Sequence, residues 1–385
     1  MNEERKYKLV NLMRYLGDGF FYPFLALYFS YLNKTESQIG WLMMIIPLLG
    51  ALVNPLWSKL SKNINYNRKY LKVLTIIEAV SIIYLLFVVK LPLLVIGTII
   101  LGIVGQPFYA LFDGYTAVYT LQENKNYAPI RLYGSLGFAF GALIAGYLLE
   151  ITSFTVIFSI TASIFVLISL VVAWIKPLNL DLDKTLVEKA EPKQLVKNGL
   201  FIKFVIYFVI TWALLFGGDA FLGVYFKSLA IESGLYGLIL FVQVILEAVV
   251  LFFLAKWKHK DKLMITMIAI VLANFFRFFI FGIDAPISLI IFASVLRPIT
   301  VGGMLYVSIE YLKLKISSKN ITLAIMISHS LKNIIQAVYT LLGGYYIEKF
   351  SYQSFYLYTA FITLLALFFI DYKQNRDIIG KDVSR

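Results

Sequence analysis

Long apolar stretches alternate with short polar breaks along nearly the whole chain. A helix needs ~20 mostly apolar residues to cross the hydrocarbon core of a bilayer. Charged or turn-forming pairs, such as Asn33–Lys34 and Asp284–Pro286, separate the stretches. The pattern predicts twelve membrane-spanning helices, at about residues 8–33, 37–60, 70–89, 92–120, 128–149, 153–175, 201–227, 234–256, 262–283, 286–312, 320–347 and 352–371.

The composition excludes an ordinary soluble domain. Hydrophobic residues make up 60% of the 385 residues and charged residues 15%, whereas typical soluble domains are about 25% charged. The mean hydropathy is +0.80. Phe (32) and Tyr (26) are abundant, as is typical of a surface that faces lipid and the membrane interfaces. We therefore expect an all-α, polytopic membrane protein embedded in a lipid bilayer.

The longest polar stretch divides the chain into halves of nearly equal size. It follows the sixth predicted span and reads KPLNLDLDKTLVEKAEPKQLVKNG, from Lys176 to Gly199. Six spans on either side of a linker are the layout of transporters built from two repeats. We predict an N-terminal six-helix bundle over residues 1–176, a cytoplasmic linker over 177–199 and a C-terminal six-helix bundle over 200–385.

Lysine and arginine predict the orientation in the membrane. If both termini are cytoplasmic, only Lys34, Lys90, Lys227 and Lys349 of the 35 Lys and Arg residues fall in external loops. Five more lie inside spans, and the rest fall in cytoplasmic segments, which is the positive-inside pattern. The net charge of +13 is therefore explained by topology, and we expect no nucleic-acid partner. We expect a multi-pass plasma-membrane protein that acts as a monomer.

The sequence offers little for enzymatic chemistry. The chain has no Cys and only two His, which excludes thiol nucleophiles and disfavours a zinc site. The motifs HExxH and GxSxG are absent. We expect no metal, no cofactor and no enzymatic activity, and an intramembrane lipid-modifying enzyme is the alternative from another class.

Ionisable residues inside the predicted spans are the strongest functional signal. A charged side chain at the centre of a lipid-exposed helix costs roughly 2.5–3.5 kcal/mol or more, so we expect these residues to face one another or a hydrated cavity. They are Arg14, Asp18, Glu78, Asp113, Arg131, Asp219, Glu247, Arg277, Arg297 and Lys332.

Several of these residues can pair with one another. Arg14 and Asp18 are four residues apart on one helix face, so they either neutralise each other or share in lining the cavity. Asp113 and Arg131 lie on successive antiparallel spans, where they can pair or bind a solute between them. For Asp219 the expected cation is Lys332 of span eleven or Arg297 of span ten.

Two carboxylates of the spans stand apart from these pairs. Glu78 receives no functional role and is interpreted at most as a structural polar contact of span three. Glu247 has no cation in its own helix, and a carboxylate held away from water binds a proton more readily. Glu247 is therefore a candidate proton carrier.

The stretch Ala128–Gly146, APIRLYGSLGFAFGALIAG, with the preceding Phe112-Asp113-Gly114, resembles the lactose permease group of the major facilitator superfamily. Nucleoside–proton symporters carry a similar string. The resemblance implies the major facilitator fold of two six-helix bundles. It also implies that Asp113 and Arg131 bind the solute, with Phe138 at the position of the aromatic residue that stacks on it.

Elsewhere the resemblance is partial. It implies that Arg277 takes part in proton coupling and that Asp219 and Lys332 form a charge pair. Arg297 stands where the group has a tenth-helix histidine, and Thr300 stands where it has the proton-loading acid. Because these departures remove the usual acid, we assign proton coupling to Glu247, with Arg277 and Arg297 modulating it.

These observations predict a secondary transporter. We expect proton-coupled import of a small polar solute, of the sugar or nucleoside class, by alternating access, with Asp18 joining Asp113, Arg131 and Phe138 as binding residues. A drug or metabolite efflux antiporter is the alternative within transport. Efflux antiporters of the superfamily usually carry a Gly-Pro motif in span five, and the fifth span beyond Pro129 has no proline.

Overall fold

The computed structural model describes residues 2–60, 64–178, 192–259 and 261–371, and they fold into helices with no strand among them. An all-helical fold follows from the apolar sequence, because backbone N–H and C=O groups in lipid must be paired within their own segment. The first half contains α1 (Glu3–Tyr31), α2 (Glu36–Leu60), α3 (Ile64–Leu86), α4 (Leu91–Gln122), α5 (Ala128–Ile151) and α6 (Phe154–Trp174). The second half contains α7 (Pro192–Lys197), α8 (Gly199–Asp219), α9 (Leu222–Ser228), α10 (Ser233–Lys256), α11 (Lys262–Gly282), α12 (Ile287–Ser294), α13 (Arg297–Lys315), α14 (Ser318–Lys349), α15 (Tyr352–Leu364) and the 3₁₀ helix η1 (Leu365–Phe369).

The helices are consistent with the twelve predicted spans. Ten segments of the described chain are long and apolar enough to cross a membrane by length and composition. The other two spans are α1 and α3, which have 29 and 23 residues but carry more charged side chains. Predicted spans seven and ten are each interrupted: α8 and α9 fall within span seven, and α12 and α13 fall within span ten. The predicted linker, 177–199, lies partly outside the described residues, and its later part forms α7.

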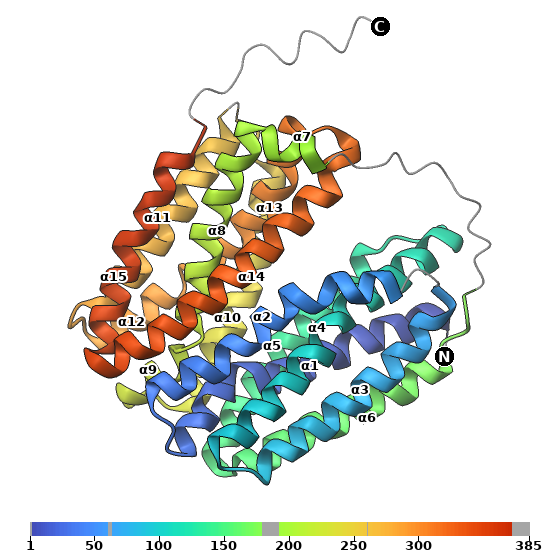
Figure 1. Ribbon diagram of the computed structural model, residues 1–385, viewed down its shortest axis with the longest axis horizontal. Coiled ribbons are helices and arrows are strands. Elements are labelled where there is room, and N and C mark those ends of the chain that lie inside the picture. Colours follow the sequence, from blue (N-terminus) through green and yellow to red (C-terminus); the bar gives the residue numbers. More distant parts are fainter. Residues whose placement is uncertain (1, 61–63, 179–191, 260, 372–385) are drawn as a thin grey trace, which may run out of the picture.

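The helices form two bundles, α1–α6 and α8–η1, which Figure 1 shows side by side and tilted against each other. Large apolar side chains such as Phe87, Ile151, Phe253 and Phe368 are exposed on the outside of the bundles. Such a surface suits contact with acyl chains rather than water. The architecture is the all-α membrane fold predicted from the sequence.

Within the described residues the bundles meet at one end, which we call the contact end; it contains Ser37, Glu150, Ser233 and Glu348. There the amide of Ser37 donates to Glu348 Oε2 at 2.9 Å, and the amide of Gly234 donates to Glu150 Oε1 at 2.6 Å. From this end the bundles diverge toward the linker end, where α7 lies and α1 begins (Figure 1). The structure therefore shows a conformation that is closed at the contact end.

Glycine permits the close approach at the contact end. A Cβ atom at Gly146 of α5 would lie 2.4 Å from the Ser233 carbonyl oxygen and 3.0 Å from Gly237 Cα of α10. A Cβ at Gly40 of α2 would lie 3.1 Å from Gly344 Cα of α14. Both positions join helices of opposite bundles, so side chains there would force the bundles apart.

This contact predicts the effect of Gly146→Leu. Overpacking costs ~1–3 kcal/mol, which shifts a two-state equilibrium by roughly 5- to 150-fold. We expect the contact end to open, so that a cysteine placed at Ser37 in this cysteine-free chain reacts faster with a membrane-impermeant maleimide. Gly114→Leu is the control, because nothing lies within 4 Å of its Cβ position. Unchanged labelling in Gly146→Leu would contradict the prediction.

Candidate functional site

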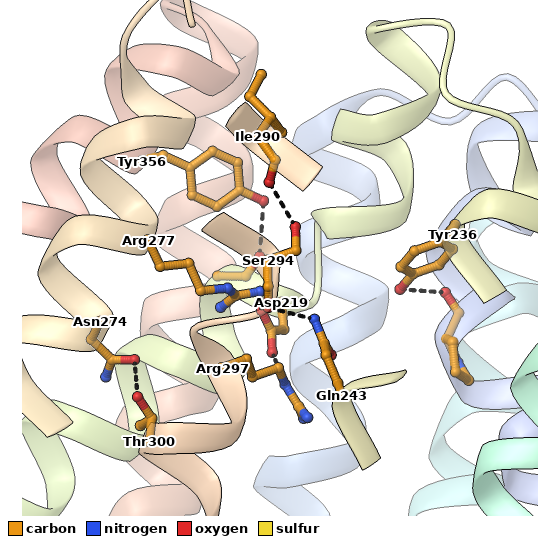
Figure 2. A network of polar contacts seen from close by, with 12 residues as sticks. Asp219, Tyr236, Gln243, Asn274, Arg277, Ile290, Ser294, Arg297, Thr300 and Tyr356 are labelled. Carbon is orange, nitrogen blue, oxygen red and sulfur yellow. Dashed lines mark hydrogen bonds and ion pairs between the residues drawn. The ribbon is translucent and has the colours of Figure 1, made fainter. Parts of the chain in front are cut away.

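Both interruptions of the C-terminal bundle lie beside an ion cluster in its interior. Asp219 is the last residue of α8, and Arg297 is the first residue of α13. Figure 2 shows these two side chains pointing toward each other between the broken spans. Broken helices at membrane depth are tolerated only where other groups satisfy the freed backbone, and they are typical of transporter sites.

The break between α12 and α13 follows from Pro298. Proline has no N–H, so the carbonyl of Ser294, four residues earlier, loses its helical partner. Gln243 Nε2 of α10 donates to that carbonyl at 2.8 Å, and both side chains are fully buried. At the break between α8 and α9, the Gly218 carbonyl accepts from the Phe221 amide at 3.2 Å and from Tyr356 Oη at 3.1 Å.

Gln243→Leu tests the role of this amide. The change leaves the Ser294 carbonyl unpaired inside the bundle, and an unsatisfied buried group costs about 1–3 kcal/mol. We expect a lower melting temperature for the purified protein. In a Pro298→Ala background residue 298 regains its N–H, so the same Gln243→Leu change should cost much less. Equal losses in the two backgrounds would show that Gln243 acts in some other way.

The ion cluster contains two acids and two arginines. Arg277 Nη2 of α11 lies 2.6 Å from Asp219 Oδ1, and Arg297 Nε lies 2.8 Å from Asp219 Oδ2. Arg297 Nη1 also lies 2.9 Å from Glu247 Oε1 of α10. The charges balance, and Asp219, Glu247 and Arg297 retain some exposure while Arg277 is fully buried. The cluster thus joins the two residues at the helix breaks to α10 and α11.

The sequence-based pairing of Asp219 with Lys332 differs from the structure. Asp219 forms ion pairs with Arg277 and Arg297. The sequence offered Arg297 as an alternative partner to Lys332 but did not offer Arg277. Lys332 of α14 donates to Gln336 of its own helix at 3.1 Å and lies over the Phe216 ring. No carboxylate pairs with Lys332 in the part of the chain that the structure describes.

A second ion cluster lies in the N-terminal bundle. Arg14 of α1 binds both carboxylate oxygens of Glu78 of α3, with Nη2 to Oε1 at 3.0 Å. Arg14 Nη2 also lies 3.2 Å from Asp18 Oδ1, and Tyr109 Oη of α4 donates to Asp18 Oδ2 at 2.8 Å. Pairing of Arg14 with Asp18, one of the two interpretations of the sequence, is present. Asp18 is only 3% exposed, so it is enclosed in this conformation.

Asp113, Arg131 and Phe138 lie on α4 and α5, near the interior of the same bundle. Tyr127 Oη donates to Asp113 Oδ1 at 2.7 Å. The Arg131 guanidinium lies 4.4 Å from the centre of the Tyr15 ring. Among the described residues Asp113 and Arg131 form no ion pair within 4.0 Å, so the two charged groups are left free to contact a third. All three predicted residues remain partly accessible.

Sequence reasoning missed Tyr109 and Gln243 as parts of these networks and named no partner for Glu78. Glu78 does make a structural polar contact, and its partner Arg14 lies 64 residues away on another helix. For Gln243 a signal exists in the sequence. Pro298 in an apolar span predicts an orphaned carbonyl, and Gln243 is one of few amide side chains placed inside a span to satisfy it.

Two bundles closed at one end, with broken helices and ions in their interior, define a transporter of the major facilitator type. The sequence matches the MFS_1 like family over residues 5–358. The chain belongs to this family, and it is a multi-pass membrane transporter rather than an enzyme.

Relatives and solved structures agree with this assignment. The uncharacterized transporter YwbF of Bacillus subtilis (strain 168) is 24% identical over 377 residues, which cover 95% of this chain and 93% of that protein. The maltose permease of Geobacillus stearothermophilus is 28% identical over 157 residues, 40% of this chain and 39% of the permease. A mutant of the nucleoside transporter NupG superposes with a TM-score of 0.83 at 15% identity, covering 95% of this chain and 98% of that one. A bacterial homologue of the lysosomal transporter Spinster, in an inward-facing conformation, reaches a TM-score of 0.71 at 10% identity, over 95% of each chain.

Proposed function

We propose that this protein imports a small polar solute of the sugar or nucleoside class together with a proton, by alternating access. The observation that carries the proposal is the placement of ionisable groups in both bundles while the bundles touch only at the contact end. Such an arrangement leaves the interior reachable from the linker end. The nucleoside transporter and the maltose permease to which the chain is similar favour this solute class.

In this proposal the termini are cytoplasmic, the protein is a monomer of the plasma membrane, and the structure is the inward-open state. Asp113 and Arg131 bind the polar groups of the solute, because charge-assisted hydrogen bonds are strong and directional. Phe138 offers an aromatic surface, and Asp18 joins when its cluster opens. Glu247 carries the proton, with Arg277 and Arg297 adjusting its affinity through the shared Asp219.

Uptake into proteoliposomes tests this function. Purified protein is reconstituted and offered labelled uridine, adenosine, maltose and lactose, with and without an imposed pH gradient. We expect accumulation of at least one solute that requires the gradient and stops when an ionophore collapses it. Empty liposomes are the control. Absence of uptake for all four solutes, with and without the gradient, would contradict the proposed solute class.

Arg131→Lys tests the binding site. Lysine keeps the charge but loses the planar pair of donors that arginine offers. A hydrogen bond to a charged group is worth about 1.5–3 kcal/mol, so we expect solute affinity to fall roughly 10- to 100-fold. Arg68→Lys, which changes an arginine that donates to the backbone of α6, is the control. Equal effects of both changes would argue against a role of Arg131 in binding.

A further inference from the structure

The cluster of Arg14, Asp18 and Glu78 in the N-terminal bundle contains more negative than positive charge. Two carboxylates face one guanidinium, whereas the cluster around Asp219 balances two with two. The three side chains are 0%, 3% and 0% exposed. The surplus carboxylate therefore has no access to water in this conformation.

A surplus charge of this kind is costly. The effective penalty for taking an ion out of water is several kcal/mol, and an unpaired buried carboxylate normally becomes neutral instead. Either a cation or a proton must therefore accompany the cluster.

Among the described residues, no further charged group from the packed helices forms an ion pair with the cluster. Tyr22 Oη of α1 lies 3.3 Å from Glu78 Oε1, and Tyr109 of α4 binds both Arg14 and Asp18. From α6 the Phe165 ring covers the guanidinium at 4.6 Å.

The nearest additional cation is Arg131 of α5. It lies over the Tyr15 ring, and its charge acts on both Asp113 and Asp18. Among the described residues Arg131 forms no ion pair with Asp18 within 4.0 Å, so the three buried residues keep their surplus.

The packing around the cluster leaves no room for a metal ion. A Cβ atom at Gly105 of α4 would lie 2.7 Å from Glu78 Oε1 and 3.0 Å from Tyr22 Oη. Aromatic rings of Phe108, Tyr109 and Phe165 lie within 5 Å of the guanidinium carbon, and hard cations need six or more oxygen ligands. A proton fits this packing, and a six-coordinate cation does not.

We propose that Arg14, Asp18 and Glu78 form a proton-binding site that holds one proton, carried by Asp18. Glu78 accepts two hydrogen bonds from Arg14 and one from Tyr22, as suits the ionised partner. Asp18 Oδ1 is buried and, apart from its 3.2 Å ion pair with Arg14, accepts no hydrogen bond from the described residues. The anion is less stabilised at Asp18, so the proton resides there.

The site is connected to the proposed solute-binding residues. Tyr109, which donates to Asp18, contacts Tyr15 in a tilted arrangement with ring centres 5.6 Å apart, and Arg131 lies over the Tyr15 ring. A solute that draws Arg131 away from Tyr15 changes the packing next to Asp18. This proton site belongs to the other bundle from Glu247 and does not depend on the identity of the solute.

Infrared spectroscopy of the purified full-length protein in lipid at neutral pH tests the proposal without any solute. We expect wild type to show the carbonyl band of a protonated carboxylic acid, shifted in D₂O. Asp18→Asn should remove this component. Glu78→Gln should remove it too, because one carboxylate then faces one guanidinium and Asp18 ionises. The loss of the band in Glu78→Gln is the specific signature. Glu78 is the ionised partner and gives no acid band itself, so the band can disappear only because Asp18 releases its proton.

Two variants serve as matched controls. Glu310→Gln changes an exposed glutamate paired with Lys313 and should leave the acid band unchanged. Glu247→Gln removes the other proposed proton carrier, so any acid band of its own is lost while the Asp18 component should remain. The proposal is overturned if wild type has no acid band, or if the Asp18 component survives in Glu78→Gln. The absence of an acid band in wild type overturns it even if a variant fails to fold. Failure of solute uptake alone would reject the proposed function and leave this result untouched.

Discussion

Arg277→Met is expected to lower the free energy of unfolding by about 3–5 kcal/mol, the range measured when one partner of a buried ion pair is removed. Arg277 is fully buried in α11 and holds Asp219 at 2.6 Å. Methionine fills similar space but leaves two carboxylates, Asp219 and Glu247, against Arg297 alone. We expect a large fall in melting temperature and in the amount of folded protein recovered from membranes.

A second change should reverse most of this loss. In the Arg277→Met background, Asp219→Asn leaves Glu247 and Arg297 as a balanced pair, so the double variant should be more stable than Arg277→Met alone. Lys313→Met removes an exposed partner of Glu310 and should cost at most about 1 kcal/mol. If Arg277→Met melts like wild type, or if Asp219→Asn makes it worse, charge balance is not what holds the cluster.

The architecture was predictable because it depends on properties that each segment carries alone. Length, hydropathy and the distribution of lysine and arginine act locally, so the spans follow from the sequence without knowledge of their neighbours. The family resemblance at Ala128–Gly146 agrees with the family match over residues 5–358. The orientation in the membrane remains a prediction.

The partners of the buried charges were less predictable, because they depend on how each helix is rotated about its axis. Arg14 and Asp18 are on one helix, and spacing alone placed them together. Glu78 and Arg14 are 64 residues apart, and nothing local relates them. The sequence offered Lys332 and Arg297 as candidate cations for Asp219. Asp219 ends α8 and Arg297 begins α13, and these two helix ends meet, so the pair forms with Arg297.

Glu247→Gln is expected to abolish accumulation of solute against its gradient while leaving exchange of labelled for unlabelled solute intact. Glutamine resembles the protonated acid, so the carrier can still change conformation but can no longer couple this change to a pH gradient. Glu247 is suited to this task because it is partly exposed, at 19%, and its contact to Arg297 is a single 2.9 Å pair that protonation would break. The measurement is uptake of whichever solute the screen identifies, with and without the pH gradient, together with counterflow.

The outcome also separates the two clusters. Glu310→Gln should behave like wild type in both assays, since it alters a carboxylate at the exposed surface. If accumulation survives in Glu247→Gln, the assignment of the coupling proton to this residue is wrong. If it is then lost in Asp18→Asn while counterflow, and hence solute binding, persists, the proton that drives transport is the one carried by Asp18 in the N-terminal bundle. Coupling would then act through Tyr109 and Tyr15 on the residues that bind the solute, rather than through the broken spans of the C-terminal bundle.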